Sequence, residues 1–307
     1  MVTSFQPRTV AEVLNILREQ QPAVLLAGGT DLMVRRRNWS GLPPCFTEPV
    51  VLLNQVAELQ TLAVGNERLT IGAGVTLRAI AEHPLVPEVL RQAVCLMASP
   101  AIRNRATLGG NICNASPAAD TLPPLYALGA SVVLRSTVEE LVIVLPIQDF
   151  ILGPGRIALA SNELLTAIEI PLTPTRYQTQ YYQKVGTRKA DALAKVSIAA
   201  LAEQRGGRLI DLRIACGAVA PRVVRDAALE GRLLGRSTRQ LPGLLPEFMA
   251  GYEPLIQPID DQRSTAVYRK RVALGLIADF CRGLAGDPFP ESIGGEADAA
   301  FDKYRGD

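Results

Sequence analysis

Two short turns, each built on a pair of adjacent glycines, constrain this 307-residue chain more than any other feature of its sequence. The backbone of such a turn can approach a ligand closely because glycine has no side chain, and consecutive N–H groups can surround an anion. A helix that begins beside the turn adds the positive end of its dipole. The first turn lies in Leu25-Leu26-Ala27-Gly28-Gly29-Thr30-Asp31-Leu32, and the second lies in Thr107-Leu108-Gly109-Gly110-Asn111.

The residues of these turns allow two interpretations. The turns could bind the two halves of a diphosphate from opposite sides, with hydroxyl donors from Thr30 and Thr107 and an amide from Asn111. Glycine pairs also form turns that bind nothing. Neither pair fits the GxGxxG pattern of a Rossmann fold, and the chain has no GxxxxGK sequence of a P-loop, so those two nucleotide-binding classes are excluded.

Hydrophobic periodicity predicts a mixture of helices and strands along the chain. The first turn follows a short apolar strand and continues into residues 30–34, which begin like a capped helix. The second turn lies in a passage rich in turn-forming residues, over 106–120, of the kind that is usually functional. Gly206-Gly207 predicts a tight hairpin. Helices are expected over 9–19, 85–98, 223–234 and 264–284 and up to residue 128; strands are expected over 23–27, 49–53, 69–77, 131–135, 141–145, 177–185, 196–204 and 209–217.

Composition excludes several classes of function. A net charge of +2 and an aromatic content of 5% give no reason to expect nucleic acid or a membrane surface as a partner. The apolar stretches are far shorter than the roughly 20 residues that span a bilayer, and the N-terminus lacks the pattern of a signal peptide. The chain has five cysteines, widely spaced and without a CxxC pair, which predicts buried thiols rather than a metal or iron–sulfur site. The single histidine, His83, excludes most hydrolases that use a Ser–His or Cys–His pair, and we expect it to be structural.

Several motifs stand in a fixed order along most of the chain. They are AGGTDL over 27–32, IRNRATLGGNI over 102–112, ASPAAD over 115–120, ELLTAIEIP over 163–171, YYQKVGTR over 181–188, ACGAVAP over 215–221 and DQRSTAVYR over 261–269. Together they resemble the FAD-binding subunit of molybdenum hydroxylases of the xanthine dehydrogenase and carbon monoxide dehydrogenase type. The resemblance covers about residues 5 to 285.

The resemblance implies an α+β chain in several parts. The first part would be the two-subdomain FAD-binding fold also found in the p-cresol methylhydroxylase and vanillyl-alcohol oxidase group, with an α/β subdomain over 1–58 and a second subdomain over 59–174. A C-terminal α+β domain with a small antiparallel sheet is expected over 175–285, followed by a flexible tail over 286–307.

The resemblance also implies where FAD would bind. Its diphosphate would lie against Leu25 to Leu32 and Thr107 to Asn111. Asp120 matches an acidic position of the flavin site, although it could instead cap the helix that follows it. Other matches to cofactor positions are Leu165 and Lys184, beside the isoalloxazine ring, and, more weakly, Met97.

Some assignments stay open at this point. Lys184 could be a solvated surface group, or its cation could lie near the flavin and stabilise the anionic reduced form. Arg103 and Arg105 could be structural anchors or contacts to partner subunits. Cys113 departs from the alanine or threonine of many relatives, and it is either a small buried hydrophobe or a neighbour of the cofactor. Replacing Gly28 or Gly110 by a larger residue is expected to reduce FAD retention with little loss of fold.

The function that the resemblance implies is electron transfer within an oxidoreductase complex. FAD would receive electrons from an iron–sulfur partner subunit and pass them to an external acceptor, which could be NAD⁺, a quinone, a protein carrier or O₂. Substrate would be hydroxylated at a molybdenum cofactor in a separate subunit, so we expect no catalytic residue and no metal ligand in this chain. A cytoplasmic location is expected.

Two other functions remain possible on the sequence. A self-sufficient FAD-dependent oxidase or reductase would have its own substrate pocket and would turn over as an isolated chain. A scaffold that has lost its flavin would lack flavin absorbance even after reconstitution with FAD.

Overall fold

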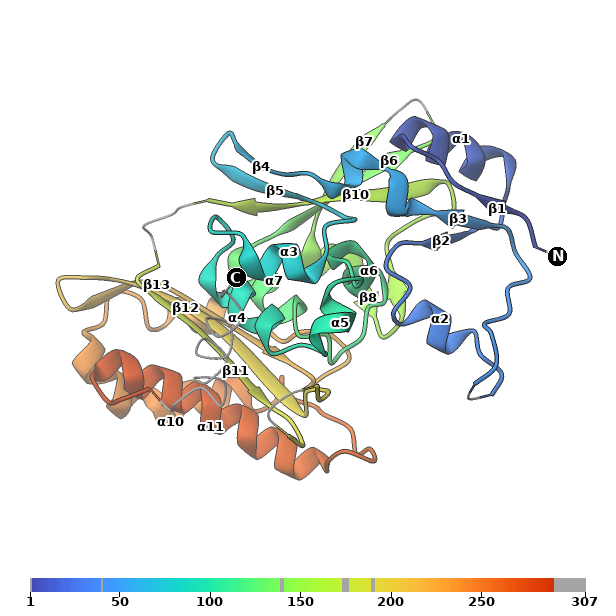
Figure 1. Cartoon of the computed structure of the whole chain (residues 1–307). Helices are drawn as coiled ribbons and strands as arrows, with labels where there is room; N and C mark the ends of the chain where they lie inside the picture. Colours follow the sequence, from blue (N-terminus) through green and yellow to red (C-terminus); the bar gives the residue numbers. More distant parts are fainter. Residues whose placement is uncertain (1, 40, 139–140, 173–176, 189–190, 290–307) are drawn as a thin grey trace, which may run out of the picture. The chain divides into compact units, whose positions relative to one another are not determined.

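The computed structural model describes residues 2–39, 41–138, 141–172, 177–188 and 191–289 of the chain (Figure 1). Its backbone contacts divide it into two compact units, each assembled from separate stretches of sequence. Unit 1 comprises Met1–Leu85, Ser99–Ala115 and Gly129–Leu172, and unit 2 comprises Val86–Ala98, Ser116–Leu128 and Thr173–Asp307. The expected subdomain boundaries stay predictions, and residues 290–307 of the expected tail lie outside the described residues.

Unit 1 begins with a small parallel sheet. Its strand order is β1-β3-β2, and the apolar side of α1 is buried through residues three or four apart, Val10, Val13 and Leu17. The Thr9 hydroxyl accepts a hydrogen bond from the Glu12 amide at 3.2 Å, which fixes the start of α1. The elements are β1 (Ser4–Phe5), α1 (Val10–Glu19), β2 (Val24–Leu26), α2 (Leu32–Arg35) and β3 (Val50–Leu52).

The rest of unit 1 is organised around a five-stranded antiparallel sheet of order β4-β5-β10-β6-β7 (Figure 1). The central strand β10 buries Leu164, Leu165, Ile168 and Ile170. Short helices surround this sheet, and most are only one or two turns long. The elements are η1 (Leu53–Gln55), η2 (Ala57–Gln60), β4 (Leu62–Gly65), β5 (Arg68–Gly72), α3 (Leu77–Glu82), α5 (Pro100–Arg103), α6 (Leu108–Cys113), β6 (Ser131–Ser136), β7 (Val142–Pro146), α8 (Ile147–Phe150), β8 (Ile151–Gly153), β9 (Arg156–Ile157) and β10 (Glu163–Pro171).

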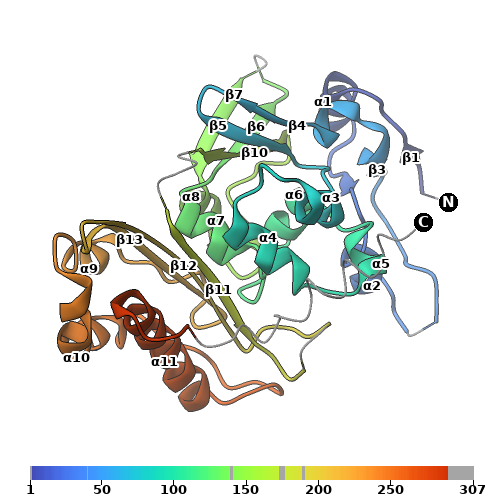
Figure 2. The ribbon, with the colours of Figure 1, turned by 60° about the vertical axis from the view of Figure 1, so that its left-hand side comes forward.

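Unit 2 contains a three-stranded antiparallel sheet of order β11-β12-β13 with helices on both of its faces (Figure 2). The long helix α11 packs on one face, and α4 and α7 pack on the other. The hairpin between β12 and β13 turns at Gly206 and Gly207, whose φ values of 58° and 72° fit the tight turn that the sequence predicts. The elements are α4 (Glu88–Cys95), α7 (Leu122–Leu128), β11 (Thr179–Val185), β12 (Val196–Arg205), β13 (Arg208–Gly217), α9 (Ala227–Gly231), η3 (Thr238–Gln240), α10 (Leu241–Tyr252) and α11 (Ala266–Ala285).

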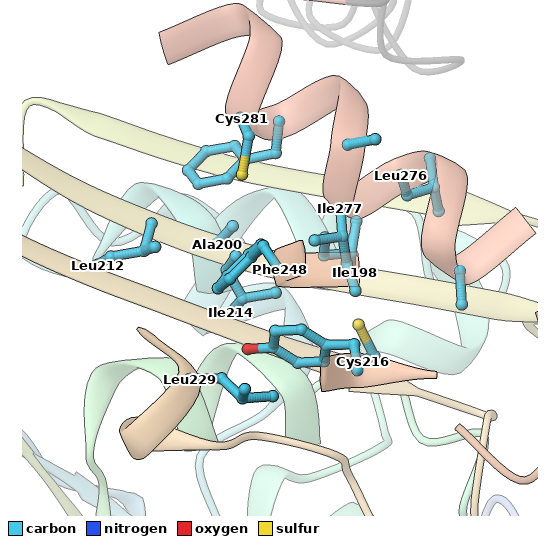
Figure 3. Packing of buried hydrophobic residues seen from close by; sticks show 14 of the residues in the cluster. Ile198, Ala200, Leu212, Ile214, Cys216, Leu229, Phe248, Leu276, Ile277 and Cys281 are labelled. Carbon is cyan, nitrogen blue, oxygen red and sulfur yellow. The ribbon is translucent and has the colours of Figure 1, made fainter. Parts of the chain in front are cut away.

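The core of unit 2 lies between its sheet and α10 and α11. Ile198 and Ala200 of β12 and Ile214 of β13 face Phe248 and Ile277 from the helices (Figure 3). Each fully buried aliphatic side chain of this kind contributes about 1.5–3 kcal/mol. Because α7 covers the opposite face, β12 is buried on both sides, and this explains its almost continuous apolar sequence.

The sequence-based prediction of an α+β chain with a small C-terminal antiparallel sheet is confirmed. Some elements differ from their expected form. The expected strand over 69–77 ends at Gly72, and Thr76 caps the unexpected helix α3. Expected helices over 85–98 and 223–234 shorten to α4 and α9. Helix α10 was not expected, since its two prolines and two glycines obscure the helical pattern, although Pro242 lies in its first turn, where proline is tolerated.

Candidate cofactor-binding site

The first glycine turn lies in unit 1 between β2 and α2. Gly29 has φ +74°, in the left-handed region that favours glycine. Gly28 needs to be glycine for a different reason. A Cβ atom at this position would lie 2.1 Å from the carbonyl oxygen of Arg105 and 2.9 Å from the Cα of Ala106. The turn therefore packs directly against the backbone that leads into the second turn.

The first turn contains backbone N–H groups that no described residue engages. Within the described part of the chain, no residue accepts a hydrogen bond from the N–H groups of Gly28, Gly29, Thr30 or Asp31. The sequence predicts a capped helix here. Asp31 occupies the N-cap position of the four-residue helix α2, but its side chain makes no capping bond. Its carboxylate instead pairs with Arg35 at 2.7 Å. The first turn thus presents a set of unengaged donors.

The second glycine turn is the start of a helix rather than an open loop. The Thr107 hydroxyl accepts a hydrogen bond from the Gly110 amide at 3.1 Å and caps α6. The amides of Leu108 and Gly109 donate to the carbonyl oxygens of Val75 and Ala73 at 3.1 and 2.9 Å, and the Asn111 amide donates to the Thr107 carbonyl at 3.0 Å. All four amides from 108 to 111 are therefore already engaged within unit 1.

The two glycines of the second turn have different surroundings. A Cβ atom on Gly109 would lie 2.6 Å from the carbonyl oxygen of Ala73, so this residue must be glycine for α6 to pack against the segment after β5. A Cβ atom on Gly110 would meet only the Thr107 hydroxyl, at 2.9 Å. Gly110 is exposed, whereas Gly109 is buried. The two glycines look equivalent in the sequence, but in the structure only Gly109 is closely packed against backbone.

The structure brings the two turns together within unit 1. Besides the contact of Gly28 with Arg105, the Arg35 guanidinium of α2 donates a hydrogen bond to the side-chain oxygen of Asn114, which ends α6. Leu165 lies in the same unit, buried in β10. Ala73 connects this strand to the second turn. Its amide donates a hydrogen bond to the carbonyl of Thr166, the residue after Leu165, at 2.9 Å, and its carbonyl accepts a hydrogen bond from the Gly109 amide.

Close contact between these turns also changes the expected effect of substitution. The sequence predicts that substitution of Gly28 spares the fold. In the structure, however, the backbone of Arg105 and Ala106 fills the space that a side chain at this position would need. Loss of FAD in such a variant would therefore follow from local rearrangement, and it would not by itself show that a ligand approaches Gly28.

The remaining predicted residues lie in unit 2, around a buried ion pair. Lys184 Nζ lies 2.7 Å from Asp120 Oδ2, and both side chains are 7% exposed. The Tyr182 hydroxyl donates to Asp120 Oδ1 at 3.1 Å. Tyr182 and Lys184 share one face of β11 because they are two residues apart in a strand. A further hydrogen bond joins Lys184 Nζ to the carbonyl of Leu96, the neighbour of Met97, at 3.1 Å. Lys184 is therefore not a solvated surface lysine.

The protonation of this cluster follows from its burial. Burial raises the pKa of the Asp120 carboxyl above its ordinary value, while the Lys184 ammonium and the two hydrogen bonds oppose that increase. Burial and the adjacent carboxylate raise the pKa of Tyr182 well above its ordinary value, so its hydroxyl stays a donor. Each Asp120 oxygen thus has a donor from the protein, and among the described residues Asp120 makes no bond that caps α7.

A hollow of about 190 Å³ adjoins this ion pair. Lys184, Leu96 and Gln183 line it together with residues 185–188. Since β11 is at the edge of its sheet, the hollow borders the open side of a strand. The side-chain oxygen of Gln183 is buried and has no hydrogen-bond partner among the described residues. A buried polar atom without a partner is costly.

Two of these residues, Tyr182 and Gln183, were not predicted to belong to the site. Both lie in the YYQKVGTR segment. Tyr182 is two residues from Lys184 and shares its face of the strand, a spacing that could have indicated it, whereas the Gln183 side chain points to the other face. His83 ends α3, where its ring nitrogen accepts a hydrogen bond from the Leu85 amide at 3.3 Å, in agreement with a structural role. The described residues contain no group of acidic, histidine and cysteine side chains that could hold a metal ion.

The cysteines only partly follow expectation. Burial raises the pKa of the thiols of Cys113, Cys216 and Cys281 to about 12, which makes them poor nucleophiles. Cys45, by contrast, is exposed, so the expectation that all thiols are buried is wrong. Among the residues with a described position, no helix combines the length and the apolar character that a bilayer crossing requires.

Comparisons with known proteins identify the domains of the chain. Residues 1–173 match the model of the FAD binding domain in molybdopterin dehydrogenase, and residues 180–284 match the CO dehydrogenase flavoprotein C-terminal domain. The chain is 31% identical to a xanthine dehydrogenase FAD-binding subunit of Escherichia coli O157:H7 over 222 residues, which are 71% of this chain and 74% of that protein. It is 30% identical to the caffeine dehydrogenase subunit beta of a Pseudomonas species, over 88% of this chain and 90% of that protein.

Solved structures give the same result. The structure of a Cu,Mo-CO dehydrogenase in its cyanide-inactivated form contains a chain that superimposes with a TM-score of 0.81 at 26% sequence identity. That match covers 90% of this chain and 95% of the other. The chain therefore belongs to the family of FAD-binding medium subunits of molybdenum hydroxylases of the xanthine dehydrogenase and CO dehydrogenase type.

Proposed function

We propose that this subunit transfers electrons from an iron–sulfur partner subunit, through FAD, to an external acceptor. The observation that carries the site assignment is the difference in hydrogen bonding between the turns. The first turn has amides at Gly28, Gly29, Thr30 and Asp31 without partners among the described residues, whereas the amides of the second turn are engaged. FAD supplies a ring that accepts and donates electrons, and the protein supplies its binding and orientation.

The first turn would hold the FAD diphosphate. Its unengaged amides can donate to phosphate oxygens, and the N-terminal end of α2 would add a favourable dipole of modest strength. The hydroxyl of Thr30 is exposed beside them. The second turn would act mainly as a rigid support, since it positions Gly28 through Arg105 and Ala106. Its contribution to the ligand would come from the side chains of Thr107 and Asn111.

Lys184 would lie beside the electron-carrying ring. Its ammonium is fixed by Asp120 and by the Leu96 carbonyl, and it lines the hollow in unit 2. A fixed cation stabilises a negative charge that develops on a bound ligand. Asp120 would act on FAD indirectly, by holding Lys184. Leu165 and Met97 would supply apolar contacts.

Partner subunits follow from the relatives rather than from this chain. One relative is the CO dehydrogenase medium chain of Hydrogenophaga pseudoflava, 27% identical over 87% of this chain. A medium chain implies other chains, and we propose that here they are an iron–sulfur subunit and a molybdenum-cofactor subunit. The proposed acceptor is NAD⁺, a quinone or O₂, and the proposed location is cytoplasmic.

The test is to isolate the chain from its native host through a tag and to identify what accompanies it. We expect a flavin absorption spectrum and two further subunits, one with iron and one with molybdenum. In the isolated chain, Lys184→Ala is expected to retain FAD and to lower the flavin reduction potential. An isolated chain that turns over a small substrate by itself would contradict the proposal. A flavin reduction potential that is unaltered in Lys184→Ala would contradict the role of Lys184.

A further inference from the structure

Helix α2 and the segment after it expose three large apolar side chains in unit 1. Trp39, the only tryptophan of the chain, is 75% exposed. Val34 and Leu42 are 60% and 49% exposed. Large apolar side chains that gather on a surface, and tryptophan above all, are typical of protein interfaces.

This exposure is built into the fold of the segment. The Cys45 amide donates to the Arg36 carbonyl at 2.9 Å and closes the base of a loop, whose described residues are 36–39 and 41–45 and which we call the Trp39 loop. The Arg36 guanidinium lies 5.5 Å from the centre of the Phe46 ring and 3.2 Å from the Glu48 carboxylate. With its base held in this way, the loop directs Trp39 outward at its tip.

The loop is also positively charged. From residue 32 to residue 47 the sequence has three arginines, at 35, 36 and 37, and no aspartate or glutamate. Arg35 and Arg36 are neutralised by Asp31 and Glu48. Arg37 is exposed and forms no ion pair with any residue that the structure describes. The loop therefore combines an exposed tryptophan with an unpaired guanidinium, the two side chains that most often dominate binding energy at interfaces.

We propose that the Trp39 loop docks onto another subunit of the dehydrogenase complex, at an apolar pocket that carries a carboxylate beside it. Trp39 would fill the pocket and Arg37 would pair with the carboxylate. This inference rests on the proposed function, because it needs a complex with partner subunits. The loop would be one anchor of a larger contact, since a stable interface buries about 800 Å² on each partner.

Other occupants fit the loop less well. A twofold dimer made through this loop would place two copies of the same cationic segment against each other, which is unfavourable. Nucleic acid would require more cations and aromatic platforms than one tryptophan and a net charge of +2 provide.

The test uses the complex isolated through a tag on this chain. Trp39→Ala and Arg37→Glu are compared with Val267→Ala, which truncates an apolar side chain that is 80% exposed in unit 2, and with Arg232→Glu, which reverses an exposed arginine there. We expect each loop variant to retain at least tenfold less partner subunit than wild type, and the two controls to retain as much as wild type. The loss in Arg37→Glu should shrink as salt increases. Trp39→Phe, which keeps an aromatic ring, should restore part of the binding.

A second measurement observes the loop directly. The chain labelled with 5-fluorotryptophan gives one ¹⁹F resonance, because Trp39 is its only tryptophan. We expect this resonance to shift when the chain enters the complex and not when the free chain is concentrated. Loop variants that keep their partners, or a resonance that is the same in the free chain and in the complex, would overturn the docking proposal. A shift on concentration alone would assign the loop to a second copy and would also overturn it.

The two proposals fail differently. A chain that carries FAD and assembles normally despite both loop substitutions contradicts only the docking proposal. A wild-type chain that carries no flavin contradicts the proposed function, and a wild-type chain that assembles with no other subunit contradicts both. The FAD content of each loop variant, expected to equal that of wild type, shows that the variant is folded.

Discussion

The two glycine turns look alike in sequence, yet the structure uses them in opposite ways. In the first turn, the amides of Gly28, Gly29 and Thr30 have no acceptor among the described residues. In the second, the amides from 108 to 111 are all bonded inside unit 1, and Thr107 caps a helix. A glycine pair in a sequence therefore indicates only that the backbone lies close to a neighbouring group. The hydrogen bonds decide whether that neighbour is the protein itself or a ligand.

Gly28→Ala is expected to have the largest effect. The new methyl group would overlap the Arg105 carbonyl, and overpacking of this kind costs about 3 kcal/mol. Urea unfolding of the FAD-free chain measures this loss of stability. If Gly28→Ala unfolds at the wild-type midpoint, the two turns are not in contact and the comparison loses its structural basis.

Gly109→Ala and Gly110→Ala divide the second turn. A methyl group on Gly109 would overlap the Ala73 carbonyl, and we expect a loss of about 2 kcal/mol. At Gly110, the contact with the Thr107 hydroxyl opposes the gain of about 1 kcal/mol that alanine brings to a helix, so the net change should be small. Thermal unfolding of both variants measures the difference. Equal destabilisation would show that the two glycines have the same role.

Thr107→Ala and Thr30→Ala test the hydroxyl groups of the two turns. Loss of the Thr107 cap should cost about 1 kcal/mol of stability. Among the described residues Thr30 makes no capping bond, so its removal should leave the stability of the FAD-free chain unchanged while FAD binds more weakly. Denaturant unfolding and FAD titration of each variant separate these effects. A destabilised Thr30→Ala chain would mean that the first turn is also a structural cap.

Arg35→Ala should have only a small effect on stability. Its ion pair with Asp31 is more than half exposed, and pairs of this kind contribute about 0–1 kcal/mol. Because Arg35 also bonds Asn114, the variant should loosen the contact between the turns and modestly weaken FAD binding. FAD titration at low and high salt measures this. A loss of more than tenfold in affinity would show that Arg35 contacts the ligand directly.

Local patterns in the sequence were sufficient to predict much of the fold. The apolar spacing in α1, the apolar run in β12 and the glycine pair between β12 and β13 each depend on neighbours in the chain. The elements that were missed or altered depend on distant neighbours. Helix α3 starts where β5 was expected to continue, and the bridge between Thr76 and Thr107 lies at that start.

The candidate site was predictable only in part. The resemblance indicated Asp120 and Lys184, but the sequence could not show that they form an ion pair, because they are 64 residues apart and the pairing depends on how α7 packs on the sheet. Nor could it show that the amides of the second turn are engaged by Ala73 and Val75, which belong to a different segment.

Amide hydrogen exchange, measured on the chain with and without FAD, tests the central claim most directly. In the FAD-free chain, we expect fast exchange of the amide hydrogens of Gly28, Gly29, Thr30 and Asp31 and slow exchange of those of residues 108 to 111. Addition of FAD should slow exchange in the first turn and leave the second almost unchanged. Protection that appears only from 108 to 111, or a first turn that exchanges equally fast with FAD bound, would contradict the assignment of the diphosphate to the first turn.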